Sequence, residues 1–475
     1  MQIRKKEVSK ILIFFLILHL TIWVLIPSLS NNNLPLDTIE ALAWSSNLDW
    51  GYAKHPPFSA WSVEFVYQIL GNQDWGYYLL SQVFVVFSFL IIFKFSEDFF
   101  QNRLISLLSI LLLEGIYFYN FTTPEFNVNV SQLPFWSLAV YFCWRGINKN
   151  DNISWLLFGL FAAFGVLSKY LFIYLLLAID VLFIYLIIKK KFNYKCLVSL
   201  ISFFIILSSH FFWLLENDFT TITYALNRTG IENQNFLEAH LFNPVMFLGK
   251  QIGVLIPFFI MLFTIISKFK PKINLKDKKL IFLLIINLVP IFLIFITSLL
   301  FGAKIRTMWM TPFYLFFGVL FLYIFKTKIT LIRLRYFFTV FIILFILSPT
   351  LYFYISMSQN NKRTDYPGKK ISNLVQQKWD NNFTNTIGIV GGDEWHGGNL
   401  VYNLNSRPKW DNIFENDKNF MIKNTDDGFI FIGDTDILSK ICKGLTKGNN
   451  LSAALAATVF IEVEKQGICM IGKKK

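Results

Sequence analysis

Long apolar runs recur along this 475-residue chain and constrain its fold more than any other feature. Many of them are about twenty residues long, which lets a helix cross the roughly 30 Å hydrocarbon core of a bilayer. In lipid, backbone polar groups must be satisfied within the spanning segment, which favours α-helices. Only 16% of the residues are charged, against about 25% in soluble proteins. The sequence therefore predicts an all-α polytopic membrane protein over most of its length.

About eleven apolar segments are predicted to span the membrane. They are Ile11–Ile26, Tyr77–Phe95, Leu104–Tyr119, Val130–Trp144, Ser154–Leu167, Leu171–Ile188, Leu197–Leu215, Val245–Ile266, Leu280–Leu300, Met308–Phe325 and Tyr336–Ile355. A cleaved signal peptide is the alternative for the first segment, because basic residues precede it. The segment is long for a signal peptide and no A-x-A sequence follows it directly, so a retained span is preferred.

The net charge of +14 has two explanations, a nucleic-acid surface or Lys and Arg collected in cytoplasmic loops. With a cytoplasmic N-terminus, the cytoplasmic loops contain Lys94, Arg103, Arg145, Lys149, Lys189, Lys190, Lys191, Lys195, Lys268, Lys270, Lys272, Lys276, Lys278, Lys279, Lys326, Lys328, Arg333 and Arg335. The opposite loops contain only Lys54, Lys169, Arg228, Lys304 and Arg306, with Lys250 at a span boundary. The positive-inside rule therefore predicts a cytoplasmic N-terminus and removes the nucleic-acid explanation.

The composition changes at residue 358, which divides a transmembrane domain (1–357) from a small domain (358–475). The odd number of predicted spans places this tail outside the cytoplasm. Short apolar strands separated by helical patterns predict an α/β domain. The expected strands are Thr386–Val390, Phe429–Ile432 and Thr458–Val463, and the expected helices are Gly368–Trp379 and Leu451–Ala457. The segment Gly391–His396 is either a ligand loop or a tight turn at a strand end.

Two of the four cysteines, Cys442 and Cys469, lie in the tail, whereas Cys143 and Cys196 lie in or next to apolar segments. Outside the cytoplasm disulfides form and persist. A Cys442–Cys469 bridge would close a loop of about 27 residues, for which chain entropy gives roughly 3 to 4 kcal/mol of stabilisation. Two unpaired buried thiols are the alternative, since spacing alone does not establish a bridge.

The first outer loop, Leu36 to Trp61, concentrates acids, bases and aromatic residues in a chain with few charges. It contains Asp37, Glu40, Asp49, Lys54, His55, Pro56 and Pro57, together with Trp44, Trp50 and Trp61. Ionisable groups at a membrane boundary indicate a functional site. The structural alternative is an amphipathic helix, Thr38–Asn47, that lies on the bilayer and ends in a proline turn.

Further motifs follow the first loop in order along the chain. The set comprises Asp37-x-x-Glu40-Ala41, Trp50-Gly51-Tyr52-x-Lys54-His55-Pro56-Pro57, Thr123-Pro124-Glu125-Phe126-Asn127, Leu167-Ser168-Lys169-Tyr170, Trp213, Arg228 and Gly392-Asp393-Glu394-Trp395. It resembles the GT-C glycosyltransferases of the dolichyl-phosphate-mannose protein mannosyltransferase superfamily. Within them it is most similar to the bacterial branch with aminoarabinose and galacturonic-acid transferases that act on lipid A. The resemblance covers nearly the whole chain.

The resemblance implies a GT-C fold and transfer of a sugar from a polyprenyl-phosphate carrier to lipid A or another cell-envelope glycan. The reaction would occur on the outer face of the bacterial inner membrane, with inversion. Asp37 matches the catalytic aspartate of the first loop, and Glu125 matches an acid of the second loop. Lys169 and Arg228 match cations that face the donor phosphate. The tail resembles the extracytoplasmic domain of the family.

Two positions of the first loop depart from the pattern of the family. His55 stands where relatives often have a lysine that contacts the phosphate. Lys54 stands where some relatives have a glutamate that helps bind a metal, which puts a metal site in doubt. Glu40 and Glu125 would pair with the cations or hold a divalent ion, and His55 with Glu125 is a candidate ligand set whose spacing is not diagnostic.

The chemistry of sugar transfer fits this set of residues. A phosphate leaving group is a weak base, so one carboxylate and several cations suffice, whereas a glycosidase uses two carboxylates. Fixed cations beside the developing negative charge stabilise the transition state. Asp37 supplies the carboxylate, and the cations are Lys54, His55, Lys169 and Arg228.

Each residue also has a structural explanation. Asp37 is a good N-cap for a helix that starts at Thr38. His55 would be an interfacial histidine without a ligand, and Lys169 a lysine that extends from a span end to the interface. The three tryptophans of the loop would anchor it at the interface or stack on sugar.

Two other function classes remain open. A transporter or flippase for a lipid-linked sugar would place ionisable residues near the bilayer midplane, in broken helices. The ionisable residues here gather in outer loops, which favours an enzyme. A glycan polymerase or ligase would act on longer lipid-linked chains.

Overall fold

The computed structural model describes residues 5–229, 235–266, 270–325, 329–412, 427–447 and 457–475. The chain forms two compact units. We call the first the helical unit; it comprises Met1–Pro27, Trp50–Phe58 and Tyr78–Ser356. We call the second the sheet unit; it comprises Ser28–Asp49, Ser59–Tyr77 and Met357–Lys475. The first loop is therefore shared between the units, although the composition of the chain marks only the change near residue 358.

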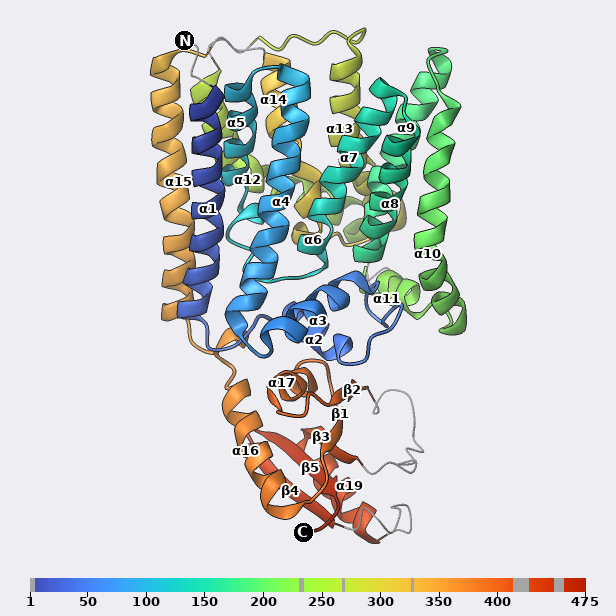
Figure 1. The fold of residues 1–475 in the computed structure, drawn as a ribbon, viewed down its shortest axis with the longest axis vertical. Coiled ribbons are helices and arrows are strands. Elements are labelled where there is room, and N and C mark those ends of the chain that lie inside the picture. The colour runs from blue at the N-terminus through green and yellow to red at the C-terminus, as the bar shows by residue number, and fades with distance from the viewer. Residues whose placement is uncertain (1–4, 230–234, 267–269, 326–328, 413–426, 448–456) are drawn as a thin grey trace. The chain divides into compact units, whose positions relative to one another are not determined.

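The helical unit holds most of the helices (Figure 1). Its longer helices are α1 (Lys5–Ser30), α4 (Asp74–Phe100), α7 (Leu133–Lys149), α8 (Asn152–Ser168), α9 (Ile173–Ile188), α10 (Val198–Glu216), α12 (Asn243–Ile265), α13 (Lys278–Phe301) and α15 (Leu331–Ser358). Its shorter helices are α5 (Arg103–Leu111), α6 (Val128–Ser131), α11 (Thr220–Arg228) and α14 (Phe317–Phe325). Its 3₁₀ turns are η1 (Leu112–Gly115), η2 (Tyr117–Tyr119), η3 (Tyr170–Phe172), η4 (Tyr194–Leu197) and η7 (Thr307–Tyr314), and η6 (Glu238–Phe242) is a π-helix.

Among the described residues, seven helices are long and apolar enough to cross a membrane. They are Lys6–Ser30, Asp74–Phe100, Tyr170–Ile188, Tyr194–Glu216, Glu238–Ile265, Lys278–Phe301 and Leu331–Ser358. The pair η7 and α14, bent by 54°, would make an eighth. These helices coincide with predicted spans, and α8 fills another predicted span with a shorter helix. The total of about eleven spans stays a prediction.

The predicted span Leu104–Tyr119 is not one helix, since α5, η1 and η2 follow one another there. Gly115 lies against the backbone of α12, where an added Cβ would come within 2.6 Å of the Phe258 Cα. The Glu114 carboxylate lies 2.6 Å from the imidazole Nδ1 of His19, and both side chains are buried. The segment is therefore apolar because it is protein interior, and hydropathy does not distinguish that from contact with lipid.

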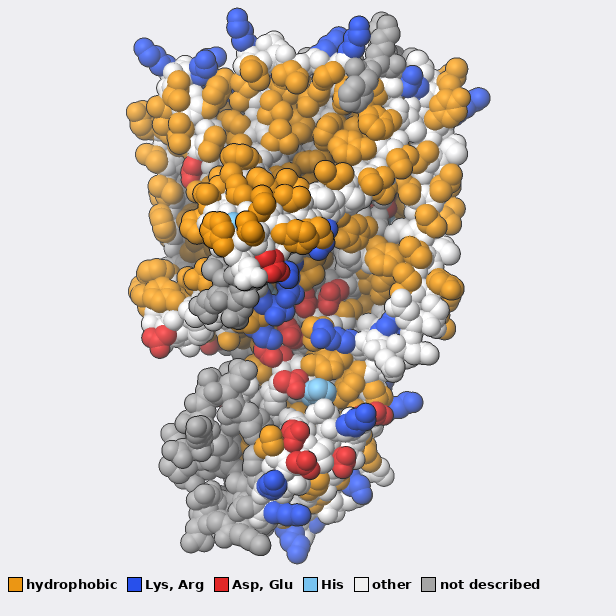
Figure 2. Space-filling model, turned by 180° about the vertical axis from the view of Figure 1, so that it is seen from behind, with side chains coloured by type: hydrophobic (Ala, Val, Ile, Leu, Met, Phe, Trp, Pro, Cys, Tyr) orange, Lys and Arg blue, Asp and Glu red, His pale blue; other side chains and the backbone are white. Residues whose placement is uncertain are grey.

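The surface of the helical unit is that of a membrane protein. Figure 2 shows hydrophobic side chains over its long helices and Lys and Arg side chains along the upper edge. Large apolar side chains such as Phe14, Ile184 and Phe204 are more than half exposed. α15 packs on α1 through aromatic pairs, with the rings of Phe15 and Phe341 5.8 Å apart. The apolar helices and this surface indicate a multi-pass membrane protein.

The sheet unit contains α2 (Leu36–Ser45), most of α3 (Phe58–Leu70), η8 (Arg363–Asp365) and the C-terminal domain. The domain holds α16 (Gly368–Asn382), α17 (His396–Asn403), α19 (Thr435–Lys447), β1 (Ile387–Gly391), β2 (Lys409–Asp411), β3 (Gly428–Asp434), β4 (Ala457–Val463) and β5 (Gln466–Gly472). The strand order is β2-β1-β3-β5-β4. β1 is parallel to β2 and β3, whereas β5 is antiparallel to β3 and β4.

Alternation along β3 builds two cores, one on each face of the sheet. Ile430 and Ile432 pack with side chains of α16 and α17, whereas Phe429 and Phe431 pack with Leu438 of α19. This period of two is what a strand covered on both faces requires. The small α/β domain predicted from the tail is confirmed.

The elements of this domain agree in part with those predicted. β1, β3, β4 and α16 lie at predicted positions, and the predicted helix Leu451–Ala457 falls almost wholly outside the described residues. The Cys442–Cys469 disulfide is present and joins α19 to β5, so that prediction is confirmed. α17, α19, β2 and β5 were not predicted. Cys143 and Cys196 are free and buried, as expected for apolar segments.

The segment Gly391–His396 forms the turn between β1 and α17. Asp393 Oδ1 accepts hydrogen bonds from the backbone N–H groups of Trp395 and His396, at 2.9 and 2.8 Å. Its other oxygen lies 2.7 Å from the imidazole Nδ1 of His396. Of the two alternatives for this segment, the described contacts match the turn that starts a helix.

Candidate functional site

A cavity of about 490 Å³ in the helical unit gathers the cations predicted from the sequence. It is lined by Lys54, His55, Pro56, Lys169, Tyr170, Leu171, Tyr174, Ile222, Tyr224, Ala225, Leu226, Arg228, Thr229, Thr297, Phe301, Ala303, Ile305 and Trp309. Three of these described lining residues are Lys or Arg, and none is Asp or Glu. The volume is within the range of small-molecule sites, roughly 300 to 1,000 Å³.

Lys169 is the most buried of these cations, with 6% of the residue exposed. It follows the last residue of α8 in extended conformation, and the next residues form η3. Its ammonium donates a hydrogen bond to the Asn129 side-chain oxygen and lies 5.2 Å from the centre of the Trp309 ring. Asn129 belongs to α6, whose start is capped by the Asn127 side chain. The cation is therefore held in place by neighbours from two elements, α6 and η7.

Arg228 ends α11, lines the cavity and is exposed. A cation at a helix C-terminus is favoured by the helix dipole. The Thr229 carbonyl accepts a hydrogen bond from the Lys304 N–H at 3.0 Å, which ties this end of α11 to the lining segment after α13. Arg228 presents a planar guanidinium, which suits bidentate contact with an anion.

Lys54 and His55 reach the cavity from the second half of the first loop. Both side chains are half-buried, and the ring of His55 lies edge-on to that of Tyr224. Burial, together with the positive charges of three nearby cations, lowers the pKa of His55 from 6.5 to about 3. His55 is therefore neutral near pH 7. An anion in the cavity would reduce this repulsion and raise the pKa.

The segment that carries Lys54 and His55 is fixed by α10 and α11. The Trp50 carbonyl lies 2.6 Å from His210 Nδ1, and the Tyr52 carbonyl accepts a 2.6 Å hydrogen bond from the Thr221 hydroxyl. Gly51 lies against the indole of Trp213, where a Cβ would come within 2.2 Å of the ring. We call these three contacts the rear clamp. A glycine is needed at this position because of the close approach.

His210 also connects the rear clamp to the cavity wall. Since the carbonyl of Trp50 can only accept, His210 Nδ1 carries the proton and Nε2 is the acceptor. The Tyr170 hydroxyl lies 2.7 Å from Nε2 and donates to it. Tyr170 is a lining residue. His210 is almost fully buried in an apolar helix. A histidine within an apolar segment is a sequence signal for function, and the motif analysis missed it.

The two acids of the Asp37-x-x-Glu40 motif lie in the sheet unit, on α2. Asp37 is the second residue of α2, and Glu40 is one turn further along the same helix. The N-cap position is Pro35, which makes no side-chain cap. The interpretation of Asp37 as an N-cap is therefore wrong. Asp37 and Glu40 are half-buried.

The interpretation of α2 as an interfacial helix is also wrong. Its apolar residues Ile39, Leu42 and Ala43 are fully buried in the protein, and Trp44 is 5% exposed. α2 therefore has no apolar face left for a bilayer. Trp50, by contrast, is 49% exposed, as an interfacial anchor would be.

Glu125 is half-buried in the segment between η2 and α6 and is not among the residues that line the cavity. That segment is tied to α4, because the Thr123 side-chain oxygen accepts a 2.9 Å hydrogen bond from Gln82. Among the residues that the structure describes, no group of three or more His, Cys, Asp or Glu side chains is placed to hold a metal ion. His55 and Glu125 therefore do not belong to such a group.

The sequence of residues 54–213 matches the family described as dolichyl-phosphate-mannose-protein mannosyltransferase. This range contains Lys54, His55, Lys169 and the rear-clamp histidine. None of the curated proteins compared by sequence matches the chain significantly.

The fold is similar to that of ArnT from Cupriavidus metallidurans. The structure of ArnT bound to undecaprenyl phosphate matches with a TM-score of 0.63 and 10% identity, over 97% of this chain and 98% of that chain. ArnT in the apo state matches with a TM-score of 0.59 and 11% identity, over the same shares of the two chains. The predicted GT-C fold is confirmed, and the family match and the fold together indicate a glycosyltransferase.

Proposed function

We propose that this protein transfers a sugar from a polyprenyl-phosphate donor to lipid A or another cell-envelope glycan on the outer face of the membrane. The observation that carries the proposal is the cavity lined by Lys54, Lys169 and Arg228. The cations suit the phosphate of the donor. The apolar side chains of the same cavity suit the first isoprene units of the carrier. ArnT, which has a similar fold, binds undecaprenyl phosphate.

The reaction breaks the bond between the anomeric carbon and the phosphate oxygen and forms a bond from that carbon to the acceptor oxygen. Attack from the opposite face inverts the anomeric centre. The electron pair of the broken bond leaves with the polyprenyl phosphate, so negative charge grows on the oxygen that the cations face. Lys169 and Arg228 stabilise this charge in the transition state, and no proton is needed on the leaving group.

We assign the acceptor proton to Asp37, the acid of the first-loop motif. An acceptor hydroxyl transfers its proton to this carboxylate as the new bond forms. An acceptor phosphate is already ionised, and in that case Asp37 orients it. Glu40 and Glu125 are assigned to substrate binding, and no step of the reaction is routed through a metal.

The same proposal includes the orientation of the chain in the bacterial inner membrane. The Lys and Arg distribution supports a cytoplasmic N-terminus and a C-terminal domain in the periplasm. The Cys442–Cys469 disulfide supports the same side for the domain, because such bridges persist in oxidising compartments. Five cations of the outer loops are then exceptions to the charge rule, and three of them line the cavity.

The test has two parts. Mass spectrometry of lipid A and surface glycans, from cells with and without the protein, identifies the sugar and the acceptor by the mass that is lost. Purified protein in lipid is then given that polyprenyl-phosphate sugar and that acceptor. Release of polyprenyl phosphate with inverted product is expected. Donor binding without release, for every glycan acceptor tried, would identify a transporter or flippase instead.

A further inference from the structure

The C-terminal domain holds the helix that carries Asp37 and Glu40. Asn33, just before α2, donates a 2.9 Å hydrogen bond to the Asn399 side chain of α17, and both residues are buried. In the middle of α2, Gly398 of α17 lies so close that a Cβ would be 3.0 Å from the Ile39 carbonyl oxygen. At the end of α2, the Ser46 hydroxyl accepts a 2.8 Å hydrogen bond from the Trp410 N–H of β2.

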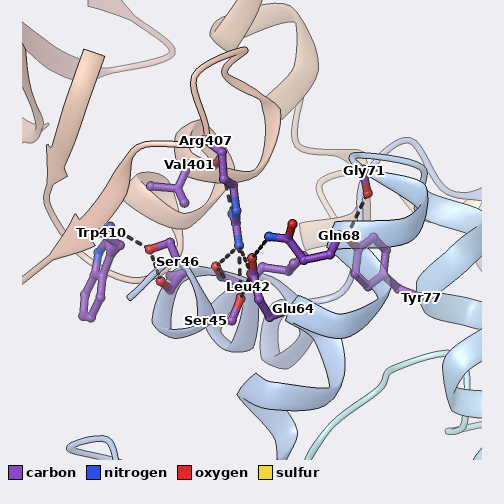
Figure 3. Close-up of polar contacts among 11 residues, drawn as sticks. Leu42, Ser45, Ser46, Glu64, Gln68, Gly71, Tyr77, Val401, Arg407 and Trp410 are labelled. Atoms are coloured by element: carbon purple, nitrogen blue, oxygen red, sulfur yellow. Dashed lines mark hydrogen bonds and ion pairs between the residues drawn. The ribbon is translucent and has the colours of Figure 1, made fainter. Parts of the chain in front are cut away.

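Arg407 is the centre of these contacts (Figure 3). Its guanidinium Nη2 donates to the Leu42 carbonyl at 2.9 Å and to the Ser45 hydroxyl at 3.0 Å, both on α2. The same nitrogen forms an ion pair with Glu64 of α3 at 2.9 Å. The guanidinium lies 4.1 Å from the centre of the Tyr67 ring. One side chain thus joins the C-terminal domain to both α2 and α3.

Glu64 is itself fixed by contacts from both α2 and α3. One carboxylate oxygen accepts a 2.8 Å hydrogen bond from Ser45, and the other accepts one of 2.7 Å from Gln68. The side chains of Arg407 and Glu64 are 13% and 10% exposed. A buried ion pair contributes little net stability but resists any geometry that separates its charges. Its effect is therefore to fix the arrangement of α2 and α3.

The backbone conformation of Arg407 also indicates that this residue is held in a fixed arrangement. Its φ is 48°, in the left-handed region that non-glycine residues rarely adopt. Pro408 follows, which restricts this residue further. Strained backbone persists where the surrounding contacts over-determine it, and it gathers at functional sites.

The contacts lie on one side of α2. Ile39, Leu42 and Ala43 recur with helical spacing and face α17 and Arg407. At 3.6 residues per turn, Asp37 and Glu40 lie on the other side of the helix. A rotation of α2 about its axis would therefore move both carboxylates.

We propose that Arg407 is a positioning residue and that the C-terminal domain acts as a front clamp, which sets the rotation and register of α2 and so directs the carboxylates of Asp37 and Glu40. The front clamp consists of Arg407, Gly398, Asn399 and Trp410 with their partners on the first loop. This inference rests on the proposed function, since it assigns the domain a role in that reaction.

The test compares Arg407→Met with Lys409→Met in purified protein in lipid. Lys409 is an exposed cation of β2, two residues from Arg407, and serves as the matched control. We expect Arg407→Met to lower kcat about 100-fold, the effect of a small misplacement of reacting groups. The dissociation constant for polyprenyl phosphate should stay within about twofold, because phosphate binding is assigned to the cations of the helical unit. Lys409→Met should leave both quantities unchanged.

Hydrogen exchange gives a readout independent of activity. In Arg407→Met, the amides of α2 should exchange faster while those of β1 and β3 stay protected. Faster exchange throughout the domain would mean that the domain has unfolded, and would assign Arg407 a structural role instead. The exchanged pair Arg407→Glu with Glu64→Arg restores the ion pair with reversed charges. It should recover part of the lost kcat relative to either single variant.

The outcomes also separate this inference from the proposed function. If the wild type releases polyprenyl phosphate and Arg407→Met does so at the same rate, Arg407 has no positioning role. If the wild type releases none with any acceptor, the proposed function is wrong. Slow α2 exchange in Arg407→Met would overturn the clamp in either case.

Discussion

The two halves of the first loop are held by different parts of the chain and with different chemistry. The front half, α2, is held by the C-terminal domain through Arg407, which donates hydrogen bonds to α2 and forms an ion pair with Glu64 of the neighbouring α3. The rear half, Trp50–Phe58, is held within the helical unit by neutral hydrogen bonds from His210 and Thr221. Asp37 and Glu40 stand on the front half, whereas Lys54, one of the three cavity cations, and the neutral His55 stand on the rear half. We therefore expect that the proposed base and the proposed phosphate contacts can be disturbed independently.

The rear clamp has a physical reason to be neutral. A charged group fixed beside Lys54 and His55 would either pair with a cation needed for the phosphate or repel it further. Burial and the nearby cations already lower the pKa of His55 to about 3. The front clamp has no such restriction, and an ion pair gives it directional contacts with two helices at once.

The largest expected effect is the loss of the proposed base. Asp37→Asn should lower kcat by about 1,000-fold, because general base catalysis contributes roughly 10² to 10⁴. The dissociation constant for polyprenyl phosphate should not change, which would show that the front half serves catalysis and not donor binding. Asp49→Asn, in the same loop but outside α2, is the control. Turnover of Asp37→Asn equal to wild type would remove Asp37 from the mechanism.

Loss of a cavity cation comes next. Lys169→Ala and Arg228→Ala should each weaken polyprenyl phosphate binding by about tenfold and slow turnover as well, since the phosphate is present in both ground and transition states. Isothermal titration and initial rates separate the two effects. Lys304→Ala changes an exposed cation beside the lining segment and should have no effect. Donor binding unchanged in both variants would contradict their assignment.

A matched pair of glycine substitutions tests the comparison directly. Gly51→Ala would place a Cβ within 2.2 Å of the Trp213 ring, and Gly398→Ala would place one 2.9 Å from the Ile39 side chain. We expect each variant to lose about tenfold, one in affinity for the donor and the other in kcat. Gly51→Ala should weaken donor binding, whereas Gly398→Ala should lower kcat alone. If both variants affect the same quantity, the two halves do not act independently.

The smallest expected effect is a pH dependence of donor binding. In the free protein His55 has a pKa of about 3 and is neutral. Bound phosphate opposes the charges of Lys54, Lys169 and Arg228 and so raises the pKa. The complex then binds more protons than the free protein, and affinity must rise as pH falls. Between about pH 7.5 and about pH 5.5 we expect a few-fold gain. His55→Gln should remove this gain, so that only the titration of the phosphate changes the affinity with pH. A pH profile of donor binding identical to that of the wild type would contradict the coupling.

The cavity cations could be predicted because two independent patterns select them. Lys54, Lys169 and Arg228 lie in loops predicted to be on the side where Lys and Arg are rare, and they are members of one ordered series along the chain. The span pattern was less informative where apolar residues face other protein. In the segment Leu104–Tyr119 the composition suits a span, yet its Glu114 is buried against His19 and the helix breaks.

The front clamp could not be predicted. Arg407 is one arginine in a polar stretch, and its partner Glu64 lies 343 residues earlier. No local pattern joins two such residues, because the contact exists only after the domain has folded. No local pattern joins Cys442 and Cys469 either. Their disulfide could be predicted because a cysteine forms a disulfide only with another cysteine, and the tail has two.

The separation of the clamp residues along the chain sets the order in which the loop matures during synthesis. His210 is 160 residues beyond Trp50, whereas Arg407 is 343 residues beyond Glu64. At about 5 to 20 residues per second, the ribosome needs roughly 20 to 70 s to reach Arg407 after Glu64. The rear half of the loop, which carries Lys54, is therefore completed first, and α2, which carries the proposed base, is completed last. A nascent chain would therefore be inactive in the proposed reaction until Arg407 has left the ribosome.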